Sequence, residues 1–303
     1  MAALLLCITI FFWGTTYRAS AIAAEHGPPI MVTAMRCLPA AIALLMAAFL
    51  LHSRLPSRAL WGWTTVIGVL GVALTIEGIS ESSARAGAAN AAVLLNTSPF
   101  WVLILERIIF KESISTVRVL GLTLGFAGIV IMVSSQLGSI PDTGNFILGM
   151  TMALIAALAW GIAIVLMKVL FVRHPQIEMI GFMAAQYIVA SAVLLPLAFG
   201  LEGTSTTDWS STGFWGPVLW LAICSSAIAN TSFVSAVRIL SPTTAASWLF
   251  MAPVVAVVVD VIYGKPPSTV VLVGMGIAIA GVAIVNGAPT LRKRRLETGS
   301  ARA

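Results

Sequence analysis

The charged residues Arg18, Arg36 and Glu77 lie inside long apolar segments of this sequence, each about six or seven residues from one end. If such a segment crosses a membrane, a charge near its middle costs about 2.5 to 3.5 kcal/mol on insertion scales, so these residues are candidates for function. One interpretation is a binding site in which Arg18 binds a carboxylate through two hydrogen bonds and Glu77 takes up and releases a proton. The alternative is a buried ion-pair network that holds helices together. For Arg36 we expect a structural or gating role.

Four aromatic residues form a second candidate group. Trp13 lies near the middle of the first apolar segment, and Tyr17 follows one helical turn later on the same face. Trp160 corresponds to Trp13 in the second half of the sequence, and Trp248 lies shortly before a proline in a later segment. Together they would form an aromatic cage for an apolar or cationic group. The alternative is packing or interfacial anchoring, which are common roles of tryptophan in membranes.

Two asparagines form a third group. Asn96 lies shortly before Pro99, and Asn230 lies where the second half places its counterpart of Glu77. A proline within a helix leaves a carbonyl oxygen without its backbone hydrogen bond, so polar groups gather there. We expect the two asparagines to hydrogen-bond a zwitterion near the membrane midplane or, alternatively, to connect neighbouring helices.

A proline and an acidic residue recur together. Pro99 corresponds to Pro253, and Glu106 and Asp260 follow these prolines at the same spacing. We expect both prolines to break their helices beside a central cavity, with the two acidic residues marking its ends. Glu106 and Asp260 would then act as symmetric gates or, more simply, as interfacial caps whose side chains reach water.

These residues have to be positioned by membrane-spanning helices. Hydrophobic residues make up 59% of the chain and charged residues 9%, whereas soluble domains carry about 25% charged residues. A helix needs about 20 mainly apolar residues to cross the hydrocarbon core. Ten segments qualify, near residues 3–24, 30–51, 60–82, 87–110, 117–134, 146–168, 179–199, 214–237, 242–264 and 269–286. The sequence therefore predicts an all-α integral membrane protein.

The two halves of the chain resemble each other. Besides the paired prolines, Trp13-Gly14 recurs as Trp160-Gly161, and the glycine-rich segment 121–128 recurs as 274–281. Five helices per half is an odd number, so the second half must cross the membrane upside down relative to the first. We predict two inverted five-helix repeats over residues 1–140 and 141–290, followed by a basic cytoplasmic tail over 291–303.

The distribution of Lys and Arg indicates the orientation. One set of alternate connections, together with the tail, holds most of these residues, whereas the other set holds only Arg85 and Lys265. By the positive-inside rule, both termini are predicted to be cytoplasmic. In this orientation Arg18, Arg36 and Glu77 all lie about 10 Å below the outer surface.

Other classes of protein are disfavoured. The net charge of +6 comes from connections and the tail rather than from a basic, aromatic-rich face, so nucleic acid is not an expected partner. Cys7, Cys37 and Cys224 form no C-x-x-C pair, and the three histidines lie in separate polar breaks, so we expect no metal site and no catalytic constellation. The first apolar segment lacks the positive region of a secretory signal, and we interpret it as a spanning helix.

The order and doubling of these motifs resemble the drug/metabolite transporter superfamily, specifically its EamA-type exporters. The resemblance rests on Trp13-Gly14, Arg36, Asn90-Ala91-Ala92, Pro99 and Lys111-Glu112-Ser113-Ile114-Ser115 in the first half, and on Trp160-Gly161, Gln186, Arg238, Ser241-Pro242, Pro253 and the helix from Gly274 in the second. The second half departs from the family's pattern at one turn, where Lys265 stands in place of a glutamate.

This resemblance implies a ten-helix exporter of small metabolites, often amino acids, in the bacterial cytoplasmic membrane. It also implies alternating access and a cavity lined by the first, third, fourth, sixth, eighth and ninth helices. We expect no cofactor, a proton as the candidate coupling ion, lipid and a small molecule as partners, and a monomer or homodimer. A facilitative channel or uniporter is one alternative. A membrane-embedded enzyme or lipid-processing protein is another, although no nucleophile, base or metal set is visible at the helix ends.

Overall fold

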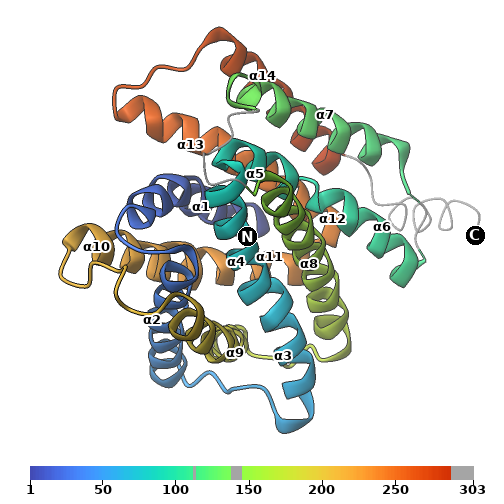
Figure 1. Cartoon of the computed structure of the whole chain (residues 1–303). Coiled ribbons are helices and arrows are strands. Elements are labelled where there is room, and N and C mark those ends of the chain that lie inside the picture. Colours follow the sequence, from blue (N-terminus) through green and yellow to red (C-terminus); the bar gives the residue numbers. More distant parts are fainter. Residues whose placement is uncertain (112–113, 138–144, 288–303) are drawn as a thin grey trace, which may run out of the picture.

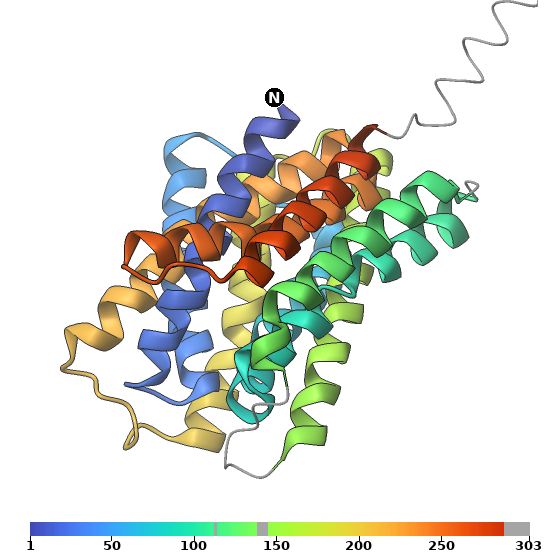
Figure 2. The same cartoon turned by 90° about the horizontal axis from the view of Figure 1, so that it is seen from above.

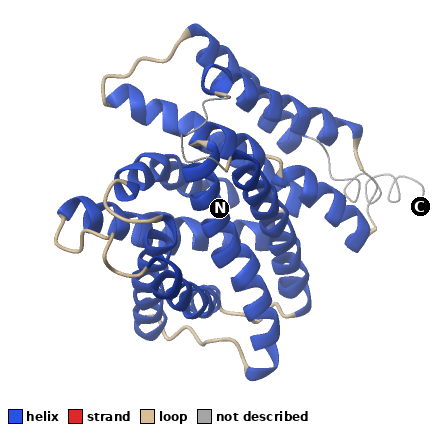
Figure 3. Ribbon diagram, viewed as in Figure 1, coloured by secondary structure: helices blue, strands red, loops and turns tan. Residues whose placement is uncertain are grey.

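The computed structural model of the chain describes residues 1–111, 114–137 and 145–287. Within these ranges the chain forms helices joined by loops, without a strand (Figure 3). Ten helical segments are long and apolar enough to cross a membrane, and we number them as spans 1 to 10 in chain order. The predicted all-α class and the number of spans are therefore confirmed. The predicted basic tail lies outside the described residues, as do Glu112 and Ser113 of the motif Lys111-Glu112-Ser113-Ile114-Ser115.

Five of the spans are single helices, and the others combine several elements (Figure 1). Spans 1, 2, 5, 6 and 10 are α1 (Ala2–Ala24), α2 (Pro29–Leu50), α7 (Thr116–Val133), α8 (Phe146–Arg173) and α14 (Thr269–Gly287). Span 3 combines η1 (Arg58–Leu60), α3 (Trp61–Gly68), η2 (Val69–Leu74) and α4 (Thr75–Ala86), and span 4 combines α5 (Ala88–Leu95) and α6 (Ser98–Phe110). Span 7 is α9 (Met179–Leu197) with η4 (Ala198–Glu202), span 8 is α10 (Thr212–Trp220), η5 (Leu221–Asn230) and α11 (Thr231–Ile239), and span 9 is α12 (Pro242–Ser247), η6 (Trp248–Phe250) and α13 (Met251–Ile262). A short 3-10 turn, η3 (Ser134–Gln136), follows α7.

Helices α7 and α14 pack against each other along their glycines. A Cβ added at Gly128 would lie 2.5 Å from the backbone nitrogen of Ala278, and one at Gly121 would lie 2.7 Å from Val285. The residue numbers rise along α7 while they fall along α14, so the two helices are antiparallel. Small residues that let helix backbones approach this closely are typical of packing in membranes. Figure 1 shows the pair at one edge of the bundle, away from α2 and α9.

Spans 2 and 7 form a second antiparallel pair, in which each span caps the other. The carboxylate of Glu202, at the end of span 7, accepts hydrogen bonds from the backbone N–H groups of Ile30 and Met31, at 3.0 and 2.7 Å. At the opposite end of the pair, the hydroxyl of Ser53 accepts a hydrogen bond from the backbone N–H of Gly181 at 3.0 Å. These bonds satisfy N–H groups that have no partner within their own helices.

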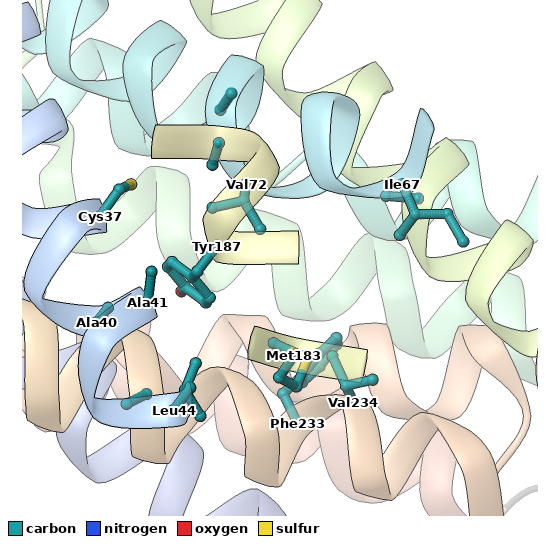
Figure 4. Close-up of a cluster of buried hydrophobic side chains, with 14 of the residues drawn as sticks. Cys37, Ala40, Ala41, Leu44, Ile67, Val72, Met183, Tyr187, Phe233 and Val234 are labelled. Atoms are coloured by element: carbon teal, nitrogen blue, oxygen red, sulfur yellow. The ribbon is translucent and has the colours of Figure 1, made fainter. Parts of the chain in front are cut away.

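The main hydrophobic core lies where α2, η2, α9 and α11 meet (Figure 4). Tyr187 of α9 and Phe233 of α11 are almost completely buried there, together with Cys37 of α2 and Val72 of η2. Helix α9 thus packs against α2, η2 and α11 in this core. Figure 2 shows the N-terminus and the C-terminal end of α14 at the same side of the bundle, as an even number of spans requires.

Candidate functional site

A cavity of about 410 Å³ lies among spans 1, 2, 3, 4, 6, 8 and 9. It is lined by Trp13, Thr16, Tyr17, Ser20, Ala21, Ala24, Pro29, Val32, Thr33, Arg36, Gly71, Thr75, Ile76, Ile79, Ser80, Ser83, Ala84, Ala88, Ala92, Leu95, Asn96, Trp160, Leu221, Ser225, Asn230, Leu249 and Ala252. These are the spans that the resemblance implied, with span 2 in addition. The volume is in the range of pockets that bind small molecules.

The cavity extends from the centre of the bundle towards one side only. Its lining reaches the end of α1 at Ala24, the start of α2 at Pro29 and the start of α5 at Ala88. In the opposite direction the lining stops at Trp13 and Trp160, which lie near the middles of α1 and α8. The cavity therefore extends from the centre of the bundle towards the α1–α2 and α4–α5 connections.

An aromatic cluster closes the inner end of the cavity. The rings of Trp13, Trp160 and Phe233 lie in mutual contact, with centroid distances of 5.9 Å between the tryptophans and 5.1 and 5.4 Å from each to Phe233. The indole N–H of Trp13 donates to the backbone oxygen of Ser225 at 3.3 Å. The ring of Trp13 is thus fixed in orientation, and Tyr17 lines the cavity one turn further along α1.

Trp248 does not join this cluster, which corrects the four-residue cage suggested by the sequence. Its indole N–H donates to the side-chain oxygen of Asn286 on α14 at 3.0 Å, and Trp248 is not among the lining residues. The reason is local, because Trp248 lies in the 3-10 segment η6, where the residues point in other directions than in an α-helix.

Spans 4 and 9 are interrupted at corresponding places. In span 4, α5 ends at Leu95 and α6 begins at Ser98, just before Pro99, and in span 9 the segment η6 precedes Pro253 by a similar distance. Asn96 in the first break and Leu249 in the second both line the cavity. The side-chain amide of Asn96 donates to the backbone oxygen of Ala92 at 2.8 Å, so it supports the break itself.

Spans 3 and 8 contain π-helical segments that the sequence does not predict. They are η2 and η5, and both contribute to the lining, through Gly71 in the first case and through Ser225 and Asn230 in the second. The wider turn of a π-segment shifts the direction of every residue that follows, and such segments are frequent at functional sites. Hydrophobic periodicity carries no signal for them in segments that are apolar throughout.

Arg36 lies against η5 rather than against an acid. Its side chain is 8% exposed, and it donates from Nε to the hydroxyl of Ser226 at 2.7 Å and from Nη2 to that of Ser225 at 2.9 Å. The hydroxyl of Thr16 in α1 lies 2.7 Å from the same Ser225 oxygen. Arg36 is thereby connected to spans 1 and 8, and it also lines the cavity.

Arg18 points away from the cavity. Its guanidinium lies over the ring of Tyr263 at the end of α13, 3.7 Å from the ring centroid, and Arg18 is not among the lining residues. A guanidinium over an aromatic face is a favourable cation–π contact. Arg18 therefore joins span 1 to span 9, whereas the two roles suggested from the sequence were binding of a substrate carboxylate and membership of a buried ion-pair network.

Glu77 belongs to α4, and its side chain lies beside Thr33 of α2. It is adjacent to the lining residue Ile76 but is not itself part of the lining. Its two carboxylate oxygens are closed off from solvent and have no hydrogen-bond partner within the described residues. The hydroxyl of Thr33, which faces Glu77 from α2, donates to the backbone oxygen of Pro29 at 2.9 Å. The ion pair that the structure contains in its described part joins Arg85 and Glu81. The ion-pair network considered as an alternative role for the three charges is therefore absent there.

Asn230 faces both the cavity and the core. It lines the cavity at the end of η5, and its side-chain amide donates to the hydroxyl oxygen of Tyr187. Both residues are buried, at 6% and 0% exposure. The bond holds η5 against α9, so Asn230 has a structural partner in addition to its place in the lining.

Glu106 closes the side of the bundle opposite to the cavity entrance. Its carboxylate accepts hydrogen bonds from the backbone N–H of Thr243, at 2.9 Å, and from the hydroxyl of the same residue. Glu106 is 5% exposed, which corrects the idea that its side chain reaches water. Nearby, the ammonium of Lys168 donates to the backbone oxygens of Val237 and Arg238 at 3.2 and 3.0 Å. Asp260, the counterpart of Glu106, is partly exposed near the end of α13.

Comparison with known proteins identifies relatives along the whole chain. The model of the EamA-like transporter family matches residues 1–134 and 147–287. An inner membrane transporter of Escherichia coli, YedA, is 29% identical over 90% of this chain and 86% of its own. The transporter YvbV of Bacillus subtilis is 25% identical over 94% of this chain and 91% of its own. A probable terminal-alkyne amino-acid exporter of Streptantibioticus cattleyicolor is 23% identical over 97% of this chain and 96% of its own.

A solved crystal structure has the same fold. It superimposes with a TM-score of 0.79 over 98% of both chains, at 20% sequence identity. The arrangement of ten helices is therefore shared with a protein whose sequence has diverged far from this one.

Proposed function

Because the chain belongs to the EamA-like transporter family, we propose that it is a secondary active transporter that exports a small metabolite by alternating access. Membrane transport as such follows from the family. The ten apolar spans, together with relatives named as bacterial inner membrane transporters, make the chain a multi-pass protein of the bacterial cytoplasmic membrane. The observation that carries the proposal is the central cavity, which extends to one side of the bundle and is closed at the other.

We propose further that the halves 1–140 and 141–290 are inverted repeats, with both termini in the cytoplasm. Two contacts between the halves support this. A Cβ at Gly14 would meet the side chain of Val255 at 2.5 Å, and a Cβ at Gly161 would meet that of Trp101 at 3.0 Å. Gly14 corresponds to Gly161, and Trp101 to Val255, so the same contact occurs twice with the roles of the halves exchanged. The pairs α7–α14 and α2–α9, which join corresponding spans in antiparallel directions, support the same relation.

Inverted repeats suggest how access alternates. In the present conformation Glu106 of α6 caps the start of α12 at Thr243. The corresponding contact would join Asp260 of α13 to the start of α5, around Asn90. No close packing of α5 on α13 is present, and the cavity lining reaches Ala88 at this place. In the opposite conformation we expect the Glu106 contact to open and the Asp260 contact to form. The breaks before Pro99 and Pro253 would serve as hinges.

The cargo that we propose is an amino acid or a related compound. The named exporter of a terminal-alkyne amino acid is a relative over nearly the whole chain. The lining of the cavity fits such a compound, because Trp13 and Trp160 offer apolar surface while Asn96 and Asn230 offer polar groups. Glu77 is proposed as the group that couples transport to protons, from its position directly behind the lining.

Flux measurements test the proposal. Metabolite profiling of the medium, with cells that overexpress the chain against cells that carry an empty vector, identifies the exported compound. The purified chain in proteoliposomes should then take up that compound in a saturable way, and faster when the same compound is present inside. Flux that neither saturates nor responds to internal compound would identify a channel and overturn the proposed mechanism.

A further inference from the structure

The cavity contains one charged side chain. Among the lining residues, all of which belong to the described part of the chain, Arg36 is the single Lys, Arg, His, Asp or Glu. A guanidinium keeps its positive charge at all pH values that a protein meets. The cavity therefore has a fixed positive charge, and no acidic side chain of the lining balances it.

The hydrogen bonds of Arg36 leave part of the guanidinium available. A guanidinium has five N–H donors. Ser226 takes the one on Nε and Ser225 takes one on Nη2, so the serines bind one edge of the group and fix its plane. The two N–H groups of Nη1 and the second one of Nη2 remain, and they form the end of the fork that can bind both oxygens of a carboxylate.

A buried charge without a counter-ion is costly, and neutral hydroxyls compensate only part of the cost. An anion that enters the cavity would supply the missing charge in an environment where water competes weakly. A free ammonium group would be repelled by Arg36 and would have no carboxylate of the lining to pair with. The apolar surface of Trp13 and Trp160 lies in the same cavity and suits an aliphatic or aromatic body.

We propose that the cavity recognises a small organic carboxylate through Arg36, and that an amino group on the ligand is dispensable. This inference rests on the proposed function and narrows its cargo to compounds with an obligatory carboxylate and an apolar body. It also assigns to Arg36 the contact that the sequence suggested for Arg18. Ser225 and Ser226 act as positioning residues, because they orient the guanidinium without contacting the carboxylate.

A series of related compounds tests the requirement for each group. Binding of 3-phenylpropionate, L-phenylalanine, 3-phenylpropanamide and 2-phenylethylamine to the purified full-length chain in detergent is measured by thermal shift and calorimetry. We expect 3-phenylpropionate to bind at least as tightly as L-phenylalanine, and the amide and the amine to bind about tenfold more weakly or not at all. Binding of the amide or amine that equals that of the acid, or no binding by either carboxylate, overturns the proposal.

Variants of the arginines locate the contact. Arg36→Gln should weaken the binding of 3-phenylpropionate by about tenfold or more and leave the binding of the amide unchanged. Arg36→Lys keeps the positive charge but cannot donate two parallel hydrogen bonds. Its affinity for 3-phenylpropionate should therefore lie between those of Arg36→Gln and the native chain. Arg18→Gln is the matched control, because it removes a guanidinium that lies on Tyr263, and it should leave the ratio of acid to amide affinity unchanged. If the ratio of acid to amide affinity falls in Arg18→Gln and is unchanged in Arg36→Gln, the assignment of the contact to Arg36 is contradicted.

Two further measurements separate folding and transport from recognition. If Arg36→Gln does not fold, Ser226→Ala tests the same point, since it frees the Nε edge and should reduce the acid-to-amide ratio less severely. Counterflow in proteoliposomes tests the transport mechanism independently. Binding of carboxylates without saturable counterflow would overturn the proposed function and leave this inference intact, whereas counterflow of amines but not acids would do the reverse.

Discussion

The carboxylate of Glu106 on α6 accepts two hydrogen bonds from Thr243, one from its backbone N–H and one from its hydroxyl. The bonds join span 4 to span 9 at the closed side of the bundle. A hydrogen bond to a charged group contributes about 1.5 to 3 kcal/mol, and a carboxylate at a helix start also interacts favourably with the helix dipole. A contact of this strength is compatible with the gate that we propose at Glu106, which has to form in one conformation and break in the other.

Removing the charge of Glu106 should loosen the closed side. In Glu106→Gln the amide can accept only weaker hydrogen bonds from Thr243, so we expect the closed side to open about tenfold more often. The reporter is Ser247→Cys on α12, a position that is completely buried, in a background without Cys7, Cys37 and Cys224. Its rate of alkylation by a membrane-impermeant maleimide added on that side should rise accordingly.

Asp260→Asn is the matched control for this measurement. Asp260 corresponds to Glu106 but lies at the other side of the bundle, so its substitution should leave the alkylation rate of Ser247→Cys unchanged or lower it. An equal rise in both variants would show that loss of an acid destabilises the whole bundle, and it would argue against a gate at Glu106.

Glu77 should carry the dependence of transport on protons. Its carboxylate oxygens are closed off from water and lack a partner in the described structure, and a buried charge in this position is costly unless a proton neutralises it. The titratable groups that face it are Glu81, Glu202 and Cys37. We expect Glu77→Gln, which mimics the neutral form, to abolish uptake driven by a pH gradient and to retain exchange of substrate for substrate.

Glu81→Gln serves as the comparison for Glu77. Glu81 is paired with Arg85 near the end of α4, so its substitution should preserve the pH-driven component of uptake. Uptake by Glu77→Gln that follows the pH gradient as in the native chain would exclude Glu77 as the coupling residue.

The close packing of α7 on α14 predicts a large difference between two glycines of one helix. A Cβ at Gly281 would lie 2.3 Å from the backbone nitrogen of Gly125, whereas a Cβ at Gly276 meets nothing within 4 Å. Gly281→Ala should therefore destabilise the chain by about 1 to 3 kcal/mol, because the helices have to move apart. Gly276→Ala should be neutral. Thermal unfolding in detergent distinguishes the two, and equal melting temperatures would contradict the packing described for this pair.

The site was only partly predictable. Trp13, Tyr17, Trp160, Asn96 and Asn230 line the cavity as their depth in the apolar segments suggested. Depth follows from residue number at 1.5 Å per residue, so the sequence specifies it. Direction around the helix axis does not follow in the same way, because segments that are apolar all round carry no periodic pattern.

The amino-acid sequence is sufficient to predict the ten spans, the doubled glycines and prolines and the family, because hydropathy and local motifs do not depend on how the helices pack. Which charged side chains line the cavity depends on the packing of the helices. Arg36 faces it with two serines, Arg18 lies on Tyr263, and Trp248 turns towards α14. Arg18 and Arg36 lie in the continuous helices α1 and α2, so the directions of their side chains depend on how these helices are rotated against their neighbours. The partners of Arg36 lie in the π-segment η5, and Trp248 lies in the 3-10 segment η6. Such irregular turns are stabilised by contacts between distant parts of the chain.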